Sequence, residues 1–190
     1  MTEKERTMTV TSDLDGRFRK AAFATGLVDA RYDLIDSPLG ELFVAATDRG
    51  LCRLGYRIDT ADEELARVFG SRVLRLPLDT VRRELDEYFA GHRQAFDLSL
   101  DLRVAPFNEQ VLHELARVPY GRTETYGGLA AKVGHPRAAR AVGTVMNRNP
   151  IAIVLPCHRI VGANGSLTGY AGGLDRKRTL LELEGATLAL

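Results

Sequence analysis

The hydrophobic pattern of this 190-residue chain changes along its length, and this change limits the possible folds more than any other feature. Between residues 32 and 56, apolar residues form short runs separated by turn-rich segments, which is typical of strands. From residue 61 onward, apolar residues recur mainly at helical spacing. The predicted strands are Tyr32–Ile35, Glu41–Ala46 and Leu51–Tyr56. The predicted helices are Ala61–Phe69, Thr80–Ala90, Asn108–Val118, Tyr126–Val133, Pro136–Met146 and Asp175–Glu184.

Strands that precede a series of helices, rather than alternating with them, indicate an α+β fold. We expect an N-terminal extension over residues 1–30, partly helical or loose, whose helix would start at Ser12 or Asp13 and end near Gly26. A small α/β domain with a short antiparallel sheet should occupy residues 31–102. A mainly helical domain should occupy residues 103–190.

Two predicted helices, Tyr126–Val133 and Pro136–Met146, are joined only by Gly134 and His135 and make a helix-turn-helix candidate. Residues 118–160 around them carry six basic side chains and one acidic side chain, Glu124. This surplus suits phosphate binding, although an ordinary solvated face would look the same. The six basic residues are Arg122, Lys132, Arg137, Arg140, Arg148 and Arg159.

The bulk composition excludes several classes of protein. Met1–Arg19 lacks the apolar core of a signal peptide, and no apolar run reaches the roughly 20 residues of a membrane helix. Two cysteines, Cys52 and Cys157, are too few for a disulfide framework. We therefore expect a cytoplasmic protein, and the excess of arginine over lysine suggests a bacterial one.

Cys157 differs from an ordinary buried cysteine in its neighbours. It follows the apolar run Ile151–Leu155, which we expect to be a buried strand or extended segment, and precedes His158 and Arg159. Nearby cations favour the reactive thiolate. Because neighbours in an extended segment point to opposite sides, a water would have to join His158 to the thiol, with Glu184 or Glu182 behind the histidine.

The segment around Cys157 is part of a longer series of motifs. Val154–Val161 reads VLPCHRIV, and the series includes Tyr126, Ala138–Gly143 (AARAVG) and Asn149-Pro150 upstream. Downstream it includes Gly169–Gly173 (GYAGG), Lys177 and Glu184-Gly185. Together these motifs resemble the O6-alkylguanine-DNA alkyltransferases, also called methylated-DNA–protein-cysteine methyltransferases. The resemblance is strong over residues 107–185 and weaker over residues 32–100.

The resemblance implies a single-turnover enzyme that transfers an alkyl group, chiefly methyl, from O6-alkylguanine and O4-alkylthymine in double-stranded DNA to its own cysteine. Cys157 would be the acceptor, His158 and Glu184 would deprotonate it through a water, and Asn149 would tie the preceding turn to the active-site segment. Tyr126 and Lys177 would stabilise the departing guanine anion. Arg140 would enter the base stack when the guanine flips out.

The remaining expected substrate contacts come from small residues and one aromatic residue. Tyr170 and Ala171 would wall the base pocket, and helix residues Ala139, Ala141, Gly143 and Thr144 would lie against the minor groove. Thr144 and Ala171 depart from relatives that have glycine and serine there. We expect no cofactor and no metal, because the first half offers only Cys52 and His92 as zinc ligands. We also expect no membrane partner, and a monomer, with clustering on DNA as a further possibility.

Three other functions fit parts of the sequence. A lesion sensor without an acceptor would not need Cys157. A thiol hydrolase would use Cys157 and His158, but it would leave the helix-turn-helix unexplained and lacks an evident oxyanion hole. A helix-turn-helix transcription factor would not need a cysteine in a pocket.

Overall fold

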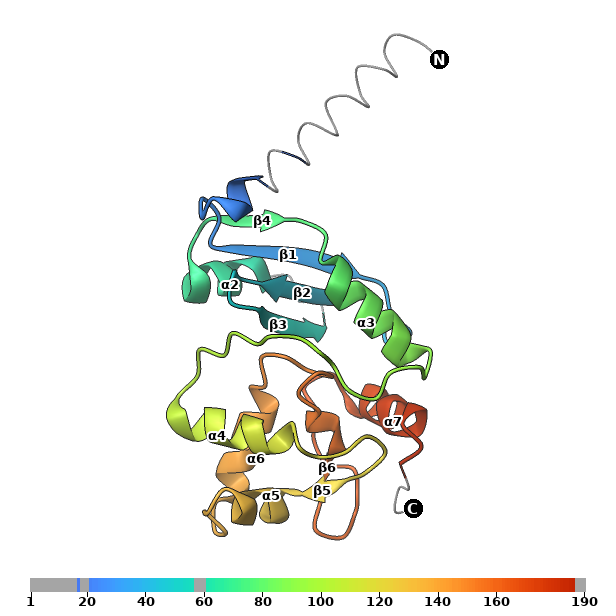
Figure 1. Cartoon of the computed structure of the whole chain (residues 1–190). Coiled ribbons are helices and arrows are strands. Elements are labelled where there is room, and N and C mark those ends of the chain that lie inside the picture. The colour runs from blue at the N-terminus through green and yellow to red at the C-terminus, as the bar shows by residue number, and fades with distance from the viewer. Residues whose placement is uncertain (1–16, 18–20, 57–60, 187–190) are drawn as a thin grey trace.

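The computed structural model describes residue 17 and the ranges 21–56 and 61–186, and it shows a sheet with two helices stacked on a mainly helical part (Figure 1). The first part contains β1 (Ala30–Ile35), β2 (Leu42–Ala46), β3 (Leu51–Tyr56), α2 (Ala61–Phe69), β4 (Val73–Arg75) and α3 (Asp79–Phe89). The second contains α4 (Pro106–Leu115), β5 (Glu124–Thr125), α5 (Tyr126–Lys132), α6 (Ala139–Asn147), the 3-10 turn η1 (Cys157–Arg159), β6 (Ile160–Val161) and α7 (Leu174–Leu183). The predicted α+β fold is confirmed.

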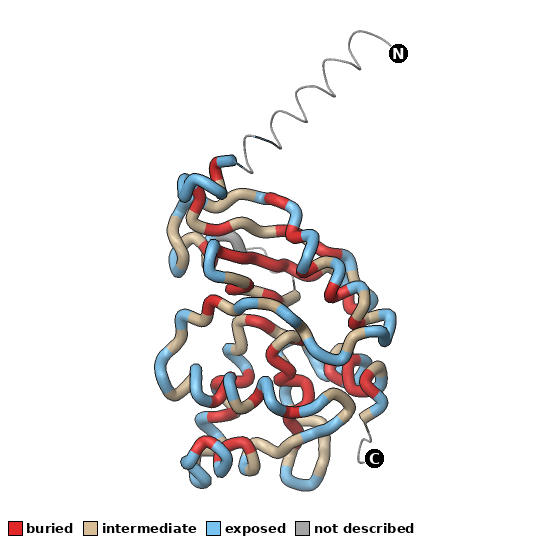
Figure 2. Tube along the Cα trace, in the orientation of Figure 1, coloured by how far each residue is buried: buried red, intermediate tan, exposed pale blue. Residues whose placement is uncertain are grey.

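The sheet has the strand order β3-β2-β1-β4. All five residues of β2 are buried because both faces of the sheet are covered (Figure 2). Phe43 and Ala45 pack with Leu65 of α2 on one face, whereas Leu42 and Val44 join the main core on the other. The sheet is not purely antiparallel as predicted, since β4, which the sequence pattern did not reveal, pairs in parallel with β1.

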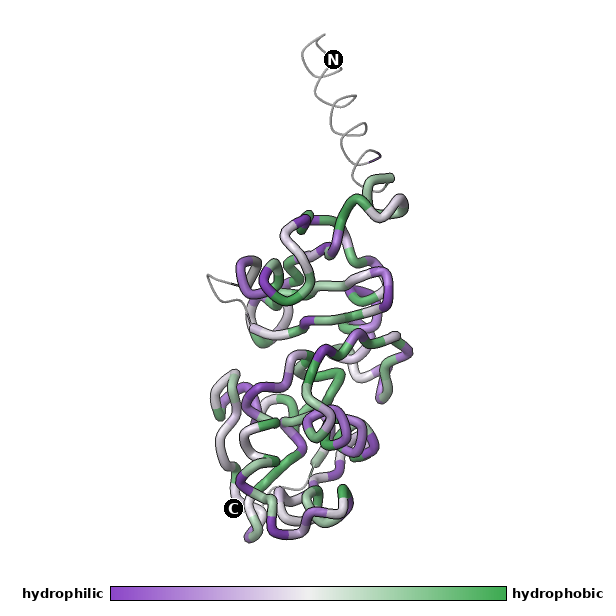
Figure 3. Tube along the Cα trace, turned by 90° about the vertical axis from the view of Figure 1, so that its left-hand side faces the viewer, coloured by the Kyte–Doolittle hydropathy of each residue, from purple (hydrophilic) through white to green (hydrophobic). Residues whose placement is uncertain are grey.

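The outer edge of β3, which pairs with no other strand of the sheet, is covered by two segments from later in the chain. Leu51 exchanges backbone hydrogen bonds with Ser99 and Asp101, and Leu54 does so with Pro150 and Ala152. One core cluster runs from the sheet through α3 and α4 to α7, so the two parts share their hydrophobic interior. Figure 3 shows apolar segments where the two parts meet. The segment leading into Cys157 is therefore anchored to the sheet.

The helix-turn-helix consists of α5 and α6. The Thr125 hydroxyl caps α5 by accepting a hydrogen bond from the amide of Gly128. The second helix starts at Ala139 rather than at Pro136, because Pro136 lies in the turn before the helix. Val142, Val145 and Met146 are buried on one face of α6, and the other face lies in solvent.

None of the helices within residues 21–56 and 61–186 is long and apolar enough to cross a membrane.

The apolar run Ile151–Leu155 is not the extended segment that we predicted. Leu155 N donates to Ile151 O at 2.9 Å, so the chain turns back on itself there. Ile153 has a φ of 72°, which is costly for a β-branched residue.

At the N-terminal end, residues 21–24 are helical and Gly26 follows with a φ of 72°. The predicted start of that helix at Ser12 or Asp13 lies outside the described residues.

Candidate active site

Cys157 is held by the residue that precedes the turn, Asn149. The Asn149 side-chain amide donates to Cys157 Sγ at 3.1 Å and to the carbonyl of Leu155 at 2.8 Å. The Asn149 carbonyl oxygen accepts from the amide of Ile151 at 3.1 Å. Asn149 thus closes the turn and fixes the sulfur with the same side chain, which matches the tie that the family resemblance implies.

The surroundings of Cys157 favour the neutral thiol at rest. Burial raises the pKa of Cys157, while the Asn149 hydrogen bond and the charge of Lys177 act in the opposite direction. A buried thiol of this kind needs a base before it can act as a nucleophile. Cys52 is also buried, and burial raises its pKa to about 12, but it does not line the pocket that Cys157 lines.

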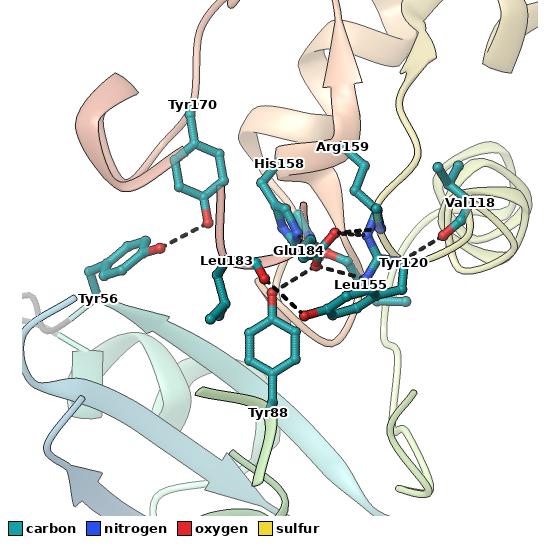
Figure 4. Close-up of polar contacts among 12 residues, drawn as sticks. Tyr56, Tyr88, Val118, Tyr120, Leu155, His158, Arg159, Tyr170, Leu183 and Glu184 are labelled. Carbon is teal, nitrogen blue, oxygen red and sulfur yellow. Dashed lines mark hydrogen bonds and ion pairs between the residues drawn. The ribbon is translucent and has the colours of Figure 1, made fainter. Parts of the chain in front are cut away.

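His158 and Glu184 form the pair that could supply the base (Figure 4). His158 Nε2 lies 2.9 Å from Glu184 Oε1, and both side chains are buried. Burial lowers the pKa of His158, so the ring is neutral at pH 7. The ionised Glu184 then fixes the proton on Nε2, and Nδ1 is left as a buried nitrogen without a partner among the described residues. Glu182, the alternative partner, is exposed.

The predicted geometry between Cys157 and His158 needs a correction. Both residues lie in the 3-10 turn η1 and not in an extended segment, so the argument from alternating side-chain directions does not apply. Their side chains still differ in surroundings, because the sulfur lines a pocket and the imidazole points to Glu184.

Glu184 is the centre of a buried hydrogen-bond network. Arg159 donates to both of its oxygens at 2.8 Å, and the Tyr88 hydroxyl donates to Oε1 at 2.7 Å. The Gly121 amide donates to Oε2 at 3.3 Å. These donors lower the pKa of Glu184 to about 2, with the His158 contact as the largest favourable cause against the cost of burial. Tyr88 comes from α3, and sequence reasoning missed its contact.

Lys177 is fully buried and does not line the pocket around Cys157. Its ammonium group donates to the carbonyls of Ile160 at 2.5 Å and Thr168 at 2.8 Å, which ties the segment after β6 to α7. Burial lowers the pKa of Lys177 to about 8. The charge of Lys177 lowers the pKa of Cys157, although Lys177 is not among the residues that line the pocket.

A pocket of about 360 Å³ opens beside Cys157. Tyr170 and Ala171, both predicted, line it together with Ala152 and Asn149. Tyr56, the last residue of β3, also lines it, and this residue was not predicted. The pocket therefore has walls from both parts of the chain.

Tyr126, which was predicted to contact the substrate, is not among the residues that line this pocket. Its ring packs near Gly143, where a Cβ would stand 3.8 Å from two ring carbons. Its hydroxyl accepts a hydrogen bond from Thr168 Oγ1 at 3.3 Å. Tyr126 thus joins α5 to α6 and to the segment that Lys177 holds.

The solvent face of α6 carries the predicted DNA contacts. Arg140, Ala141 and Thr144 are exposed, and Ala139 and Gly143 are half-buried. The Thr144 hydroxyl donates to the Arg140 carbonyl, so it is bonded within the helix. The long, charged side chain of Arg140 therefore projects from a helix face on which its neighbours, Ala139 and Ala141, are small.

The predicted basic surface is smaller than its six residues suggested. Arg159 is buried against Glu184, and Lys132 forms an ion pair with Glu124 at 2.7 Å. Arg122, Arg137, Arg140 and Arg148 are exposed, and none of the four forms an ion pair with another described residue. Within the described ranges, no three histidine, cysteine or acidic side chains come together as a metal site.

Comparisons with known proteins agree with this arrangement. Residues 30–102 match the sequence model of the 6-O-methylguanine DNA methyltransferase ribonuclease-like domain, and residues 106–186 match that of its DNA binding domain. The methylated-DNA–protein-cysteine methyltransferase of Mycolicibacterium paratuberculosis is 47% identical over 159 residues, covering 80% of this chain and 91% of the relative. That of Methanosarcina barkeri is 41% identical over 162 residues, covering 80% and 96%.

Solved structures extend the similarity to three dimensions. The crystal structure of Mycobacterium tuberculosis OGT in complex with DNA matches with a TM-score of 0.74 and 43% identity, covering 82% of this chain and 92% of that one. The O6-methylguanine-DNA methyltransferase of Pyrococcus kodakaraensis matches with a TM-score of 0.60 and 25% identity, covering 83% and 99%. On the family models, the relatives and the shared fold, this chain belongs to the 6-O-methylguanine DNA methyltransferase family.

Proposed function

We propose that this protein repairs DNA by transferring an alkyl group, chiefly methyl, from O6-alkylguanine to Cys157 in one irreversible turnover. One observation carries the proposal: a buried thiol lines a pocket and is followed directly by a neutral histidine that an ionised glutamate orients. Membership of the family supports it. O4-alkylthymine would be a second substrate, because it presents an alkylated oxygen of the same kind.

The proton of Cys157 would leave through a water to Nδ1 of His158. That nitrogen is the free one, since Nε2 is engaged with Glu184. The resulting imidazolium would face the carboxylate of Glu184, whose pKa of about 2 keeps it charged. Arg159, bound to both oxygens of Glu184, would hold the carboxylate in place.

In the transfer step, the Cys157 sulfur would attack the alkyl carbon and form a carbon–sulfur bond. The bond between that carbon and O6 would break, and its electron pair would leave with the guanine, which would then take up a proton. Lys177 would favour the thiolate through its positive charge, as its effect on the pKa of Cys157 indicates. Tyr126 would serve as a hydrogen-bond donor to the departing base. The thioether product is a poor leaving group, so the protein would react once.

The base would have to leave the duplex to reach a cysteine that is only 5% exposed. We propose that α6 lies in the minor groove, with Ala139, Ala141, Gly143 and Thr144 close to the backbone. Arg140 would fill the space left by the flipped base, which offsets part of the cost of unstacking. The exposed arginines of this surface would bind phosphates without reading the sequence.

The decisive experiment is an intact-mass measurement after incubation with a duplex oligonucleotide that contains one O6-methylguanine. The expected result is one added methyl group per protein, mapped to Cys157 by peptide analysis. Cys52→Ser serves as the matched control and should accept the methyl group normally. An unmodified protein, or a methyl group at another residue, would refute the proposal.

We also place the protein in the bacterial cytoplasm. Both cysteines would stay reduced in that compartment, and both are free in the structure.

A further inference from the structure

Tyr56 occupies a position that the sheet fixes. Two residues before it, Leu54 accepts a hydrogen bond from Ala152 at 2.8 Å and donates one to Pro150 at 2.9 Å. These bonds join β3 to the segment that leads into Cys157. Because of this register, the end of β3 reaches the pocket wall, and Tyr56 shares that wall with Cys157 and Tyr170.

The Tyr56 side chain is restrained by contacts with three residues. Its hydroxyl lies 2.9 Å from the hydroxyl of Tyr170, and the two rings meet edge-on with centroids 6.0 Å apart (Figure 4). The guanidinium of Arg176 lies over the Tyr56 ring, 4.4 Å from its centroid. Gly172 touches the ring so closely that a Cβ there would clash with it. The ring therefore has little freedom to move.

The Tyr56 hydroxyl is also near enough to the sulfur to sense its charge. Burial raises the pKa of Tyr56 and of Tyr170, and ionisation of Cys157 raises both further. Both phenols are therefore neutral when Cys157 reacts, and neither adds a negative charge beside the thiolate. Because both rings line the same pocket as Cys157, a bulky alkyl group bound there would have to share the pocket with them.

We propose that Tyr56 is a specificity-determining residue, which limits the size of the alkyl group by forming one wall of the pocket and by holding Tyr170 in place. This inference rests on the proposed function and deepens it. The small side chains of Ala152 and Ala171 leave room for groups larger than methyl. Tyr56 would set the limit as one of the bulky side chains of the wall, and it comes from a strand of the sheet that does not contain the nucleophile.

The test compares rate constants for transfer of methyl and of benzyl from O6-alkylguanine in the same duplex. In Tyr56→Ala, the ratio of the benzyl to the methyl rate should rise at least about ten-fold, since pocket walls discriminate groups by roughly this factor. Tyr56→Phe keeps the ring and loses only the bond to Tyr170, so its ratio should rise less. Tyr56→Leu replaces Tyr56→Ala if the latter does not fold.

Tyr32→Ala is the matched control. Tyr32 is a half-buried tyrosine in the same sheet, stacked on Phe43 at 5.3 Å and away from the pocket. It should lower stability without changing the ratio. An unchanged ratio in the Tyr56 variants, or equal changes in the Tyr32 variant, would overturn the inference. A wild-type protein that transfers neither group would instead refute the proposed function, so the two failures are distinguishable.

Discussion

Replacing Glu184 with glutamine tests the buried network behind His158. The wild-type carboxylate accepts hydrogen bonds from four residues, namely Tyr88, Gly121, His158 and Arg159. Glutamine has almost the same shape, but it carries no charge, and one of its two acceptor positions becomes a donor. The Arg159 guanidinium would then be buried beside a neutral group, and one amide would face other donors. The variant should therefore fold less stably.

The structure allows an estimate of the loss. A glutamate whose pKa is about 2 instead of 4.5 is stabilised in its ionised form by about 3 kcal/mol. Breaking a buried ion pair by removing one partner costs about 3–5 kcal/mol. Both routes predict that Glu184→Gln lowers the free energy of unfolding by about 3–5 kcal/mol at pH 7. For a domain of this size the melting temperature should fall by roughly 10 °C.

The loss should depend on pH in a defined direction. The pKa of Glu184 is lower in the folded protein, so its contribution is fully present above the ordinary pKa of 4.5. As the pH falls from 4.5 towards 2, the unfolded state takes up the proton first and the contribution disappears. The stabilities of the wild type and Glu184→Gln should therefore converge in acid. Urea unfolding of both proteins at pH 7 and at about pH 3 measures this convergence.

Two further variants provide a graded comparison. Glu182→Gln changes an exposed glutamate at the end of the same helix and should alter stability by less than about 0.5 kcal/mol. Tyr88→Phe removes one donor to the carboxylate and should cost about 2 kcal/mol. A loss in Glu184→Gln no larger than in Glu182→Gln, or one that stays the same at acidic pH, would refute the account of a buried, ionised Glu184.

Three other predictions concern the reaction. Cys157→Ser should abolish methyl transfer, because a hydroxyl is a far weaker nucleophile, but should keep affinity for duplex DNA in a gel-shift assay; residual stoichiometric transfer would remove Cys157 from its role. Arg140→Ala should slow transfer from duplex DNA more than transfer from the free alkylguanine base. The control is Arg117→Ala, which removes an exposed arginine paired with Glu114 and should slow neither reaction. Equal slowing of both substrates by Arg140→Ala would contradict a role of Arg140 in base flipping. Methylated protein should melt several degrees lower than unreacted protein, because the added methyl group crowds the Asn149 amide, which lies 3.1 Å from the sulfur. Overpacking of this kind costs about 1–3 kcal/mol of stability. An unchanged melting temperature would show that the pocket accepts the group freely.

Periodicity predicted most of the long elements, because burial of one face imposes a regular spacing on each of them. It failed for β4 and for the two-residue strands β5 and β6, which are too short to show any period. It also failed for Ile151–Leu155, where five apolar residues suggested a strand. All but Ala152 and Val154 of these are buried, but the chain turns at Ile153. An unbroken apolar run reports burial and not backbone direction.

The choice between Glu182 and Glu184 illustrates what the residues alone left open. Glu182 and Glu184 are two residues apart, which corresponds to about 200° around the axis of an α-helix. Only one of the two side chains can therefore face the protein interior. The sequence placed both near the end of a helix without fixing its rotation. Packing of Leu180 and Leu181 fixes it, and Glu184 then meets His158 while Glu182 points to solvent.

Tyr88 and Tyr56 were missed for a different reason, since each acts across the boundary between the two parts. Tyr88 did lie within the predicted helix Thr80–Ala90, and a buried tyrosine usually needs a partner for its hydroxyl. That signal predicts a hydrogen bond but not its acceptor. Tyr56 gave no such signal, because its place in the pocket depends on how β3 pairs with Pro150–Ala152.

The sheet of this protein therefore does more than support the DNA-binding part. Its β3 edge fixes the turn before Cys157, α3 supplies a donor to Glu184, and the end of β3 forms a wall of the pocket. Each of these contacts crosses between the parts, and the core cluster that carries them is continuous. Changes in the packing between the sheet and α7 should consequently alter the nucleophile, its base and its substrate range together, even where no residue of the active-site segment is changed.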